Sequence, residues 1–221
     1  MRRHFAKFGL VIGILGICGG TAQAEQINVD GLAASTPGDF PKNWKTYPFH
    51  YGKAGRVYKV AEEGGRRIIR ASDSEDISVP IAKDFHWDIA KYPYLKYRWR
   101  AQKLPAGARE DSGATNDSGC AVYVGFGRTS ALKYVWSTSL PPGSFWAKNP
   151  GKFVIISKES GNGSVGSWKE ETVSVKEDYE RYFGKPMGGK KPSGVGIMTD
   201  GNAVHQPAAC DYADFRISTA P

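Results

Sequence analysis

Short stretches in which hydrophobic and polar residues alternate recur along the chain from Arg56 onward, and this period of two is typical of half-buried β-strands. The clearest stretch is YLKYRWRAQ, at residues 94–102. One of its faces carries Leu95, Tyr97, Trp99 and Ala101, and the other carries Lys96, Arg98 and Arg100. The run FVIIS at 153–157 is hydrophobic at every position, which predicts a strand buried on both faces.

Further strands are predicted from shorter runs that turn-forming residues separate. Residues 56–63 and 66–72 flank Gly64-Gly65 and predict a hairpin. The other predicted strands lie at 76–82, 85–89, 120–128, 132–138, 194–200 and 211–218. About ten short strands at regular spacing, without an internal repeat or a linker, favour a single mainly β domain. The predicted fold is an antiparallel β-sandwich of jelly-roll type.

One short helix is expected to interrupt the strands, at 175–183. Ser174 and Glu177 have the spacing of a capping box at its start, and Gly184 followed by Pro186 is typical of a helix end. Its aromatic residues, Tyr179, Tyr182 and Phe183, recur at helical spacing.

The first 24 residues predict a cleaved signal peptide. A basic start, MRRHFAKFG, precedes the apolar run LVIGILGI, and Ala22 and Ala24 offer small residues for cleavage. Ordinary secretory export and twin-arginine export both fit, and a retained membrane anchor is the alternative. We expect residues 25–221 to form one periplasmic or secreted domain, with no transmembrane segment after cleavage.

The charge balance is modestly basic. Without Arg2, Arg3 and Lys7 of the predicted signal, 27 basic and 22 acidic residues remain, a net charge of +5. These charges are spread along the chain, which argues against a nucleic-acid partner. An exported basic protein suits an anionic envelope ligand such as a polysaccharide, although solubility alone also explains the charge.

Two cysteines, Cys120 and Cys210, remain after the predicted signal. Each lies near the start of a predicted strand. An even number of cysteines in an oxidising compartment suggests a disulfide, and two separate buried thiols are the alternative.

Several ordered motifs resemble a known bacterial exported family. They are PYLKYRWR at 93–100, LKYVWS at 132–137, WKEE at 168–171, VKEDYERYFG at 175–184 and GIMTD at 196–200. Together they are similar to domain-of-unknown-function family 3047. The resemblance implies a single β-sandwich domain in the envelope and no established activity. The family's pattern has paired aspartates where this chain has Asn116-Asp117, and a D-x-D-N-T turn where this chain has Asp200-Gly201-Asn202.

The two ends of the chain also resemble carbohydrate-binding jelly rolls, more loosely. Residues 40–44 read F-P-x-x-W, and 211–217 read as a final strand. Many β-sandwiches share these features, so the likeness concerns the fold alone.

A ligand site is predicted from three kinds of side chain. The basic strand face, Lys96, Arg98 and Arg100, could hold an anionic ligand or a sugar, or could pair with neighbouring acids instead. Trp146 lies between Pro/Gly-rich segments and is the aromatic most expected to be exposed for stacking on a sugar. Asp200 is included because it ends a predicted strand.

Acidic residues near two late strand ends suggest a structural calcium ion. The predicted ligands are Asp200, Asp211 and Asp214. Hydrogen bonding within turns explains Asp at such positions equally well. No other cofactor is expected.

Catalytic signals are scarce, and no catalytic residue is predicted. The histidines at 50, 86 and 205 lack metal-ligand spacing, and neither a G-x-S-x-G elbow nor the E-x-D-x-E pattern of sandwich-fold glycanases occurs. The leading hypothesis is therefore a non-catalytic periplasmic binding module for a glycan or another envelope ligand. The alternatives are a carbohydrate-active hydrolase or lyase, and a structural or assembly partner in the envelope.

Overall fold

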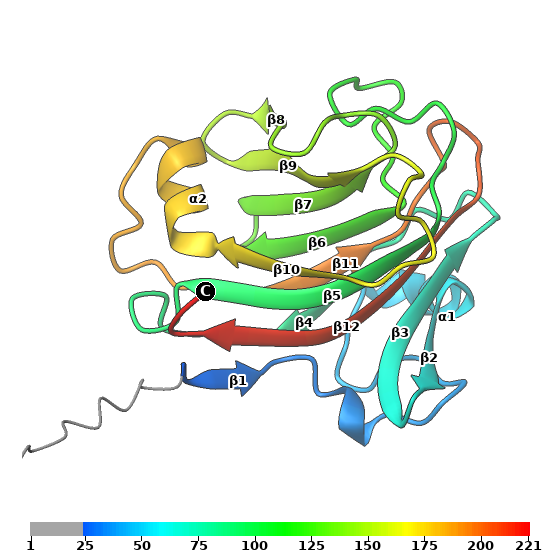
Figure 1. Cartoon of the computed structure of the whole chain (residues 1–221), viewed down its shortest axis with the longest axis horizontal. Helices are drawn as coiled ribbons and strands as arrows, with labels where there is room; N and C mark the ends of the chain where they lie inside the picture. Colours follow the sequence, from blue (N-terminus) through cyan, green and yellow to red (C-terminus); the bar gives the residue numbers. More distant parts are fainter. Residues whose placement is uncertain (1–23) are drawn as a thin grey trace, which may run out of the picture.

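Two six-stranded sheets pack face to face in the computed structural model, which describes residues 24–221 (Figure 1). Sheet A has the order β10 (Lys169–Ser174), β5 (Tyr94–Lys103), β12 (Ala208–Ser218), β3 (Arg66–Asp73) and β2 (Tyr58–Glu63), and β1 (Gln26–Asn28) also pairs with β12. Sheet B has the order β4 (Ile81–Asp84), β11 (Gly194–Met198), β6 (Cys120–Gly125), β7 (Ala131–Ser137), β9 (Phe153–Ser160) and β8 (Phe145–Asn149). The predicted signal peptide lies almost wholly outside the described residues.

The predicted mainly β sandwich is confirmed, and the chain crosses repeatedly between the sheets as it does in jelly rolls. One pair departs from the antiparallel prediction, because β7 and β9 run parallel. Between them the chain forms β8 at the edge of sheet B and then returns, so that β9 is inserted between β7 and β8.

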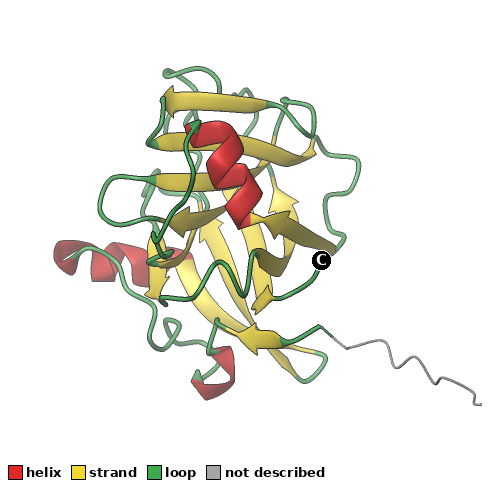
Figure 2. Ribbon diagram, turned by 90° about the vertical axis from the view of Figure 1, so that its left-hand side faces the viewer, coloured by secondary structure: helices red, strands yellow, loops and turns green. Residues whose placement is uncertain are grey.

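The predicted helix is present as α2 (Val175–Phe183), and it closes one end of the sandwich (Figures 1 and 2). Its aromatic face packs on Phe126, whose ring centroid lies 4.8 Å from that of Tyr179. Gly184 ends the helix in the left-handed conformation, with φ 66°. Ser174 is the N-cap residue, but its side chain makes no capping hydrogen bond, so the predicted capping box does not form.

A second helix, α1 (Tyr51–Val57), was not predicted. It contains Gly52 and Gly55, and glycine is a poor helix former, so its sequence carries little helical signal. Two short 3₁₀ turns, Leu32–Ala34 and Pro48–His50, lie before α1.

The core between the sheets is rich in aromatic side chains. Tyr97 and Trp99 of β5 are fully buried and meet Trp136 of β7, with 6.1 Å between the ring centroids of the two tryptophans. Cys120 of β6 and Cys210 of β12 form a disulfide, with 5.5 Å between their Cα atoms. Of the two alternatives, a disulfide and two separate buried thiols, the structure contains the disulfide. This bond covalently joins the two sheets.

Within residues 24–221, no helix combines the length and the hydrophobicity needed to cross a membrane.

Candidate functional site

A row of side chains crosses the outer face of sheet B, the face turned away from the core. Tyr123 of β6 pairs with Lys133 of β7, Lys133 pairs with Ile155 of β9, and Ile155 pairs with Trp146 of β8. Directly paired residues point to the same side of a sheet, so these four side chains stand next to one another. Tyr123, Ile155 and Trp146 belong to a small outer hydrophobic cluster that is separate from the main core. Beyond Tyr123 the row continues with Gly196 of β11.

A pocket of about 410 Å³ opens beside this row. Two loops complete it, 104–119 and 199–207, which lie together at the end of the sandwich opposite α2 (Figure 1). They are tied together by hydrogen bonds: the backbone N–H of Ser118 donates to the Asp200 carboxylate (3.2 Å), and that of Val204 donates to the Asp117 carboxylate (2.9 Å). These bonds hold both acids at the wall of the pocket.

Asp200 has an unusual affinity for protons. It is 4% exposed, and burial, together with the negative charge of the adjacent Asp117, raises its pKa from 3.8 to about 6 against the opposing effect of Lys133. Asp200 therefore retains a proton at mildly acidic pH.

Lys133 is a buried cation on the floor of this pocket. It is 4% exposed, and its ammonium lies 5.6 Å from the centre of the Tyr123 ring. No carboxylate of the described chain lies within 4 Å of that ammonium. Burial alone would lower the pKa of Lys133, but Tyr123 and the acids Asp200 and Glu110 outweigh burial and hold this pKa above its usual value. Lys133 therefore carries its charge without a direct counter-ion.

Half-buried aromatic side chains surround the cation. Phe153 lines the pocket, with its ring centroid 6.3 Å from that of Tyr123. Trp146 packs against the same outer cluster. It lies in strand β8 and is half-buried, whereas we predicted an exposed loop residue. The sequence thus identified two members of this face, Trp146 and Asp200, and missed Tyr123 and Lys133.

Comparison with known proteins places the chain in a family. Residues 42–216 match the family described as "Protein of unknown function (DUF3047)". The chain belongs to the DUF3047 family. This confirms the resemblance that the sequence motifs indicated.

No curated protein matches this DUF3047 chain. Among solved structures, a family 29 carbohydrate-binding module from Piromyces equi is 12% identical, with a TM-score of 0.36 over 90% of this chain and 92% of that one. The xyloglucanase domain of NopAA, a type three effector from Sinorhizobium fredii solved with cellobiose, is 9% identical, with a TM-score of 0.41 over 72% of this chain and 86% of that one. At such scores neither likeness informs on the ligand or the activity of the DUF3047 chain.

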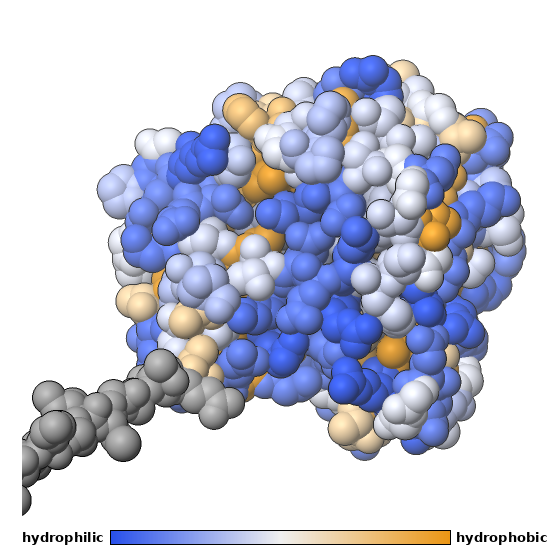
Figure 3. All heavy atoms as spheres, in the orientation of Figure 1, coloured by the Kyte–Doolittle hydropathy of each residue, from blue (hydrophilic) through white to orange (hydrophobic). Residues whose placement is uncertain are grey.

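The basic face predicted as a ligand site lies on sheet A, on the other side of the molecule, and two of its three cations are satisfied internally. Arg98 pairs with Asp214 (3.2 Å), and Arg100 pairs with Asp211 and Glu63 (2.6 Å each). Both guanidinium groups also lie over the Trp168 ring, at 4.8 and 4.6 Å. Lys96 lies on the same strand. The surface over β5 and β12 is accordingly hydrophilic (Figure 3). The face could hold a ligand or pair with neighbouring acids, and for Arg98 and Arg100 the structure shows the pairing with acids.

The acids predicted to bind calcium do not come together, so this ligand set is wrong. Asp211 accepts hydrogen bonds from Arg70, Arg100 and Gln102, and Asp214 accepts from Arg66 and Arg98. Asp200 belongs to sheet B instead. Across the described residues, no three His, Cys, Asp or Glu side chains gather as metal ligands.

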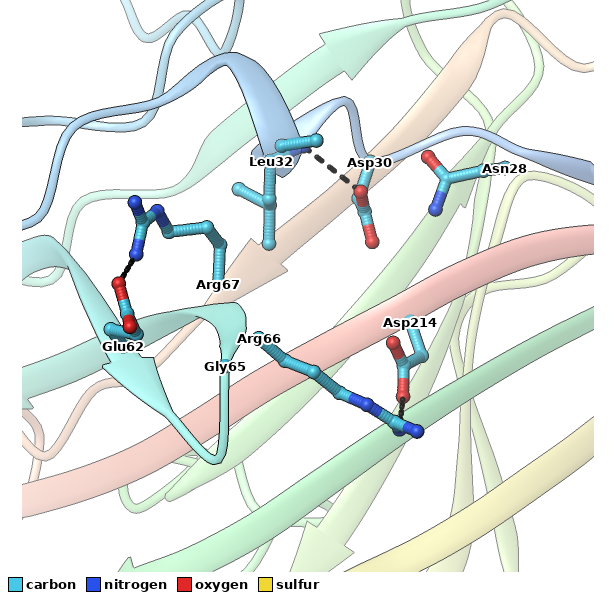
Figure 4. Close-up of a pocket in the computed structure, with 9 residues that line it drawn as sticks. Asn28, Asp30, Leu32, Glu62, Gly65, Arg66, Arg67 and Asp214 are labelled. Carbon is cyan, nitrogen blue, oxygen red and sulfur yellow. Dashed lines mark hydrogen bonds and ion pairs between the residues drawn. The ribbon is translucent and has the colours of Figure 1, made fainter.

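Another hollow, of about 490 Å³, lies beside Asp30 (Figure 4). Its charged groups have partners: Arg67 pairs with Glu62, and Arg66 lies 3.5 Å from Asp214. Asp30, whose pKa is raised by burial, accepts the backbone N–H groups of Leu32 and Phe215. The charged groups named here thus have partners, whereas the buried ammonium of Lys133 has no direct counter-ion among the described residues.

Proposed function

We propose that this DUF3047 protein is a non-catalytic glycan-binding module of the bacterial envelope, and that the outer face of sheet B holds the glycan. The observation that carries the proposal is the row of Tyr123, Lys133, Ile155 and Trp146 beside a pocket that contains Asp200. A sugar ring has apolar faces that suit aromatic side chains and hydroxyl groups that suit charged ones. Ligand sites generally combine apolar or aromatic side chains with a few placed polar groups, as this face does.

The arrangement of the acids favours binding over hydrolysis. Glycosidases generally hold two carboxyl groups about 5–10 Å apart on either side of the scissile bond. Asp117 and Asp200 instead interact directly with each other, at one wall of the pocket. They therefore do not form a separated pair of the kind that flanks a glycosidic bond.

An envelope location is part of this proposal. The predicted signal peptide supports export, and the Cys120–Cys210 disulfide suits an oxidising compartment.

A binding screen tests the proposed function. Residues 25–221 would be titrated calorimetrically with neutral and acidic polysaccharides, and each ligand found would be tested on Trp146→Ala and, as a matched control, Trp168→Ala on sheet A. Burial of a large side chain is worth about 1.5–3 kcal/mol, so W146A should weaken binding roughly tenfold or more. W168A should leave binding unchanged. Loss of binding in W168A alone would place the ligand on sheet A, and failure of the whole panel to bind would refute the proposal.

A further inference from the structure

Three hollows form a trough across sheet B. The pocket over Lys133 shares Tyr123 with a hollow of about 310 Å³, and that hollow shares Tyr47 and Ala82 with another of about 270 Å³ beside β4. The trough therefore extends across the strand order β9-β7-β6-β11-β4. Four spacings between strands correspond to about 19 Å, which is longer than a single sugar ring.

Small residues keep the middle of this trough open. Gly125, Gly194 and Gly196 line the second hollow. A Cβ atom on Gly196 would lie 3.5 Å from the Cβ of Tyr123 and 3.2 Å from the carbonyl oxygen of Ile81. Any larger side chain there would crowd Tyr123 and fill the passage between the hollows.

The charges in the trough leave a positive centre. Lys133 and Lys148 both line the first pocket, opposite the pair Asp117 and Asp200. Below about pH 6 Asp200 retains a proton, so the two lysines outnumber the ionised acids of this pocket. Glu110 lies beneath, where burial raises its pKa and the hydroxyl groups of two serines donate to it at 3.2 and 2.6 Å.

The ammonium of Lys133 is buried and charged, and no carboxylate of the described residues contacts it directly, so it can accept a further anionic partner. The protein supplies Lys133 with only distant acids and an aromatic ring. A group that enters from the pocket could supply the missing negative charge.

Building on the proposed function, we infer that the ligand is a linear acidic glycan that runs across the strands of sheet B and places an acidic group on Lys133. The glycine-lined hollow holds the neighbouring sugars of the chain, and Tyr47 forms the wall beyond them. Binding of such a ligand weakens as pH rises through about 6, because ionisation of Asp200 adds a negative charge to the pocket that holds the acidic group.

Matched acidic and neutral ligands test this inference. Residues 25–221 would be titrated with polygalacturonate and its fully methyl-esterified form, and with alginate and carboxyl-reduced alginate, at pH 5 and pH 8. We expect at least tenfold tighter binding of an acidic member at pH 5, and a smaller difference at pH 8. A galacturonate hexamer should also bind at least tenfold more tightly than the monomer.

Two lysine variants locate the charge. Lys133→Met should abolish the preference for the acidic form and leave binding of the neutral form nearly unchanged, whereas Lys59→Met, an exposed lysine on sheet A, should change neither. Because Lys133 is buried, K133M would first be checked by thermal unfolding. Lys148→Met, at an exposed position, should weaken acidic binding a few-fold whether or not K133M folds.

The outcomes separate the two proposals. Equal affinity for acidic and neutral forms, or an equal loss of both in K133M and K148M, would overturn the acidic ligand and leave a glycan-binding module. Equal affinity for monomer and hexamer would overturn the path across the strands. No binding to any of these glycans would overturn the proposed function as well.

Discussion

The carboxyl group of Asp200 should make the protein less stable as pH rises through the weakly acidic range. Its pKa is about 6 in the folded chain, against 3.8 for the unperturbed group. The folded state therefore binds a proton more tightly than the unfolded state, which favours folding below both values. The stability that this proton provides is lost as pH rises through the pKa of Asp200 in the folded chain. At about 1.4 kcal/mol per unit, the full effect is about 3 kcal/mol, and the part lost between pH 4 and pH 8 is about 2–2.5 kcal/mol.

The substitution Asp200→Asn isolates this effect. The asparagine oxygen can still accept the N–H of Ser118, so the main change is the loss of the ionisable group. Free energies of unfolding from urea titrations at pH 4 and pH 8 would be compared between the variant and the wild type. The stability of D200N relative to the wild type should rise by about 2–2.5 kcal/mol between the two pH values.

An exposed acid provides the control. Hydrogen bonding and ion pairing with Arg109 lower the pKa of Asp111, so Asp111→Asn should show a small effect of opposite sign. If the difference between D200N and the wild type were the same at pH 4 and pH 8, the raised pKa of Asp200 would be wrong.

Three further predictions concern stability, measured by urea unfolding. The disulfide joins residues 90 apart, so replacing Cys120 and Cys210 together by alanine should lower the free energy of unfolding by about 4.6 kcal/mol on the chain-entropy account. A loss under about 1 kcal/mol would contradict this account. Arg100→Met removes one hydrogen-bonding partner of the buried Asp211 and should lower the free energy of unfolding by about 2–4 kcal/mol. The double variant that also carries Asp211→Asn should recover part of this loss. If it recovers none, the ion pair is not the cause of the loss. Gly184→Ala should cost about 1 kcal/mol, since alanine disfavours φ 66°, and a stabilised variant would refute this.

The elements predicted correctly are those whose signal is local. In β5, alternate residues from Leu95 to Ala101 are buried, as the period of two indicated. The hairpin of β2 and β3 turns at Gly64-Gly65, both with positive φ, and α2 has the predicted bounds. Each of these features depends on residues within a few positions of one another.

The elements that were missed depend on distant partners. Strand β8 is five residues long and pairs irregularly with β9 at the sheet edge, so its own sequence alternates too little to be recognised. The parallel pairing of β7 with β9 arises because β8 occupies the edge of sheet B. The alternation of hydrophobic and polar residues carries no information on the order of strands in a sheet. Lys133 did leave a signal: it lies within ALKYVWS, a run otherwise dominated by apolar residues.

The two basic strand faces show why residue type alone misplaced the candidate site. On sheet A, Asp211 of β12 lies directly opposite Arg70 of β3 and Arg100 of β5, so the acid between two arginines neutralises the face. On sheet B, the residues opposite Lys133 are Tyr123 and Ile155, and neither can pair with its charge. A buried lysine without an acid opposite it is therefore a stronger indication of an external ligand than arginines that have acids beside them. Strand order decides between the two cases, and long-range pairing sets that order.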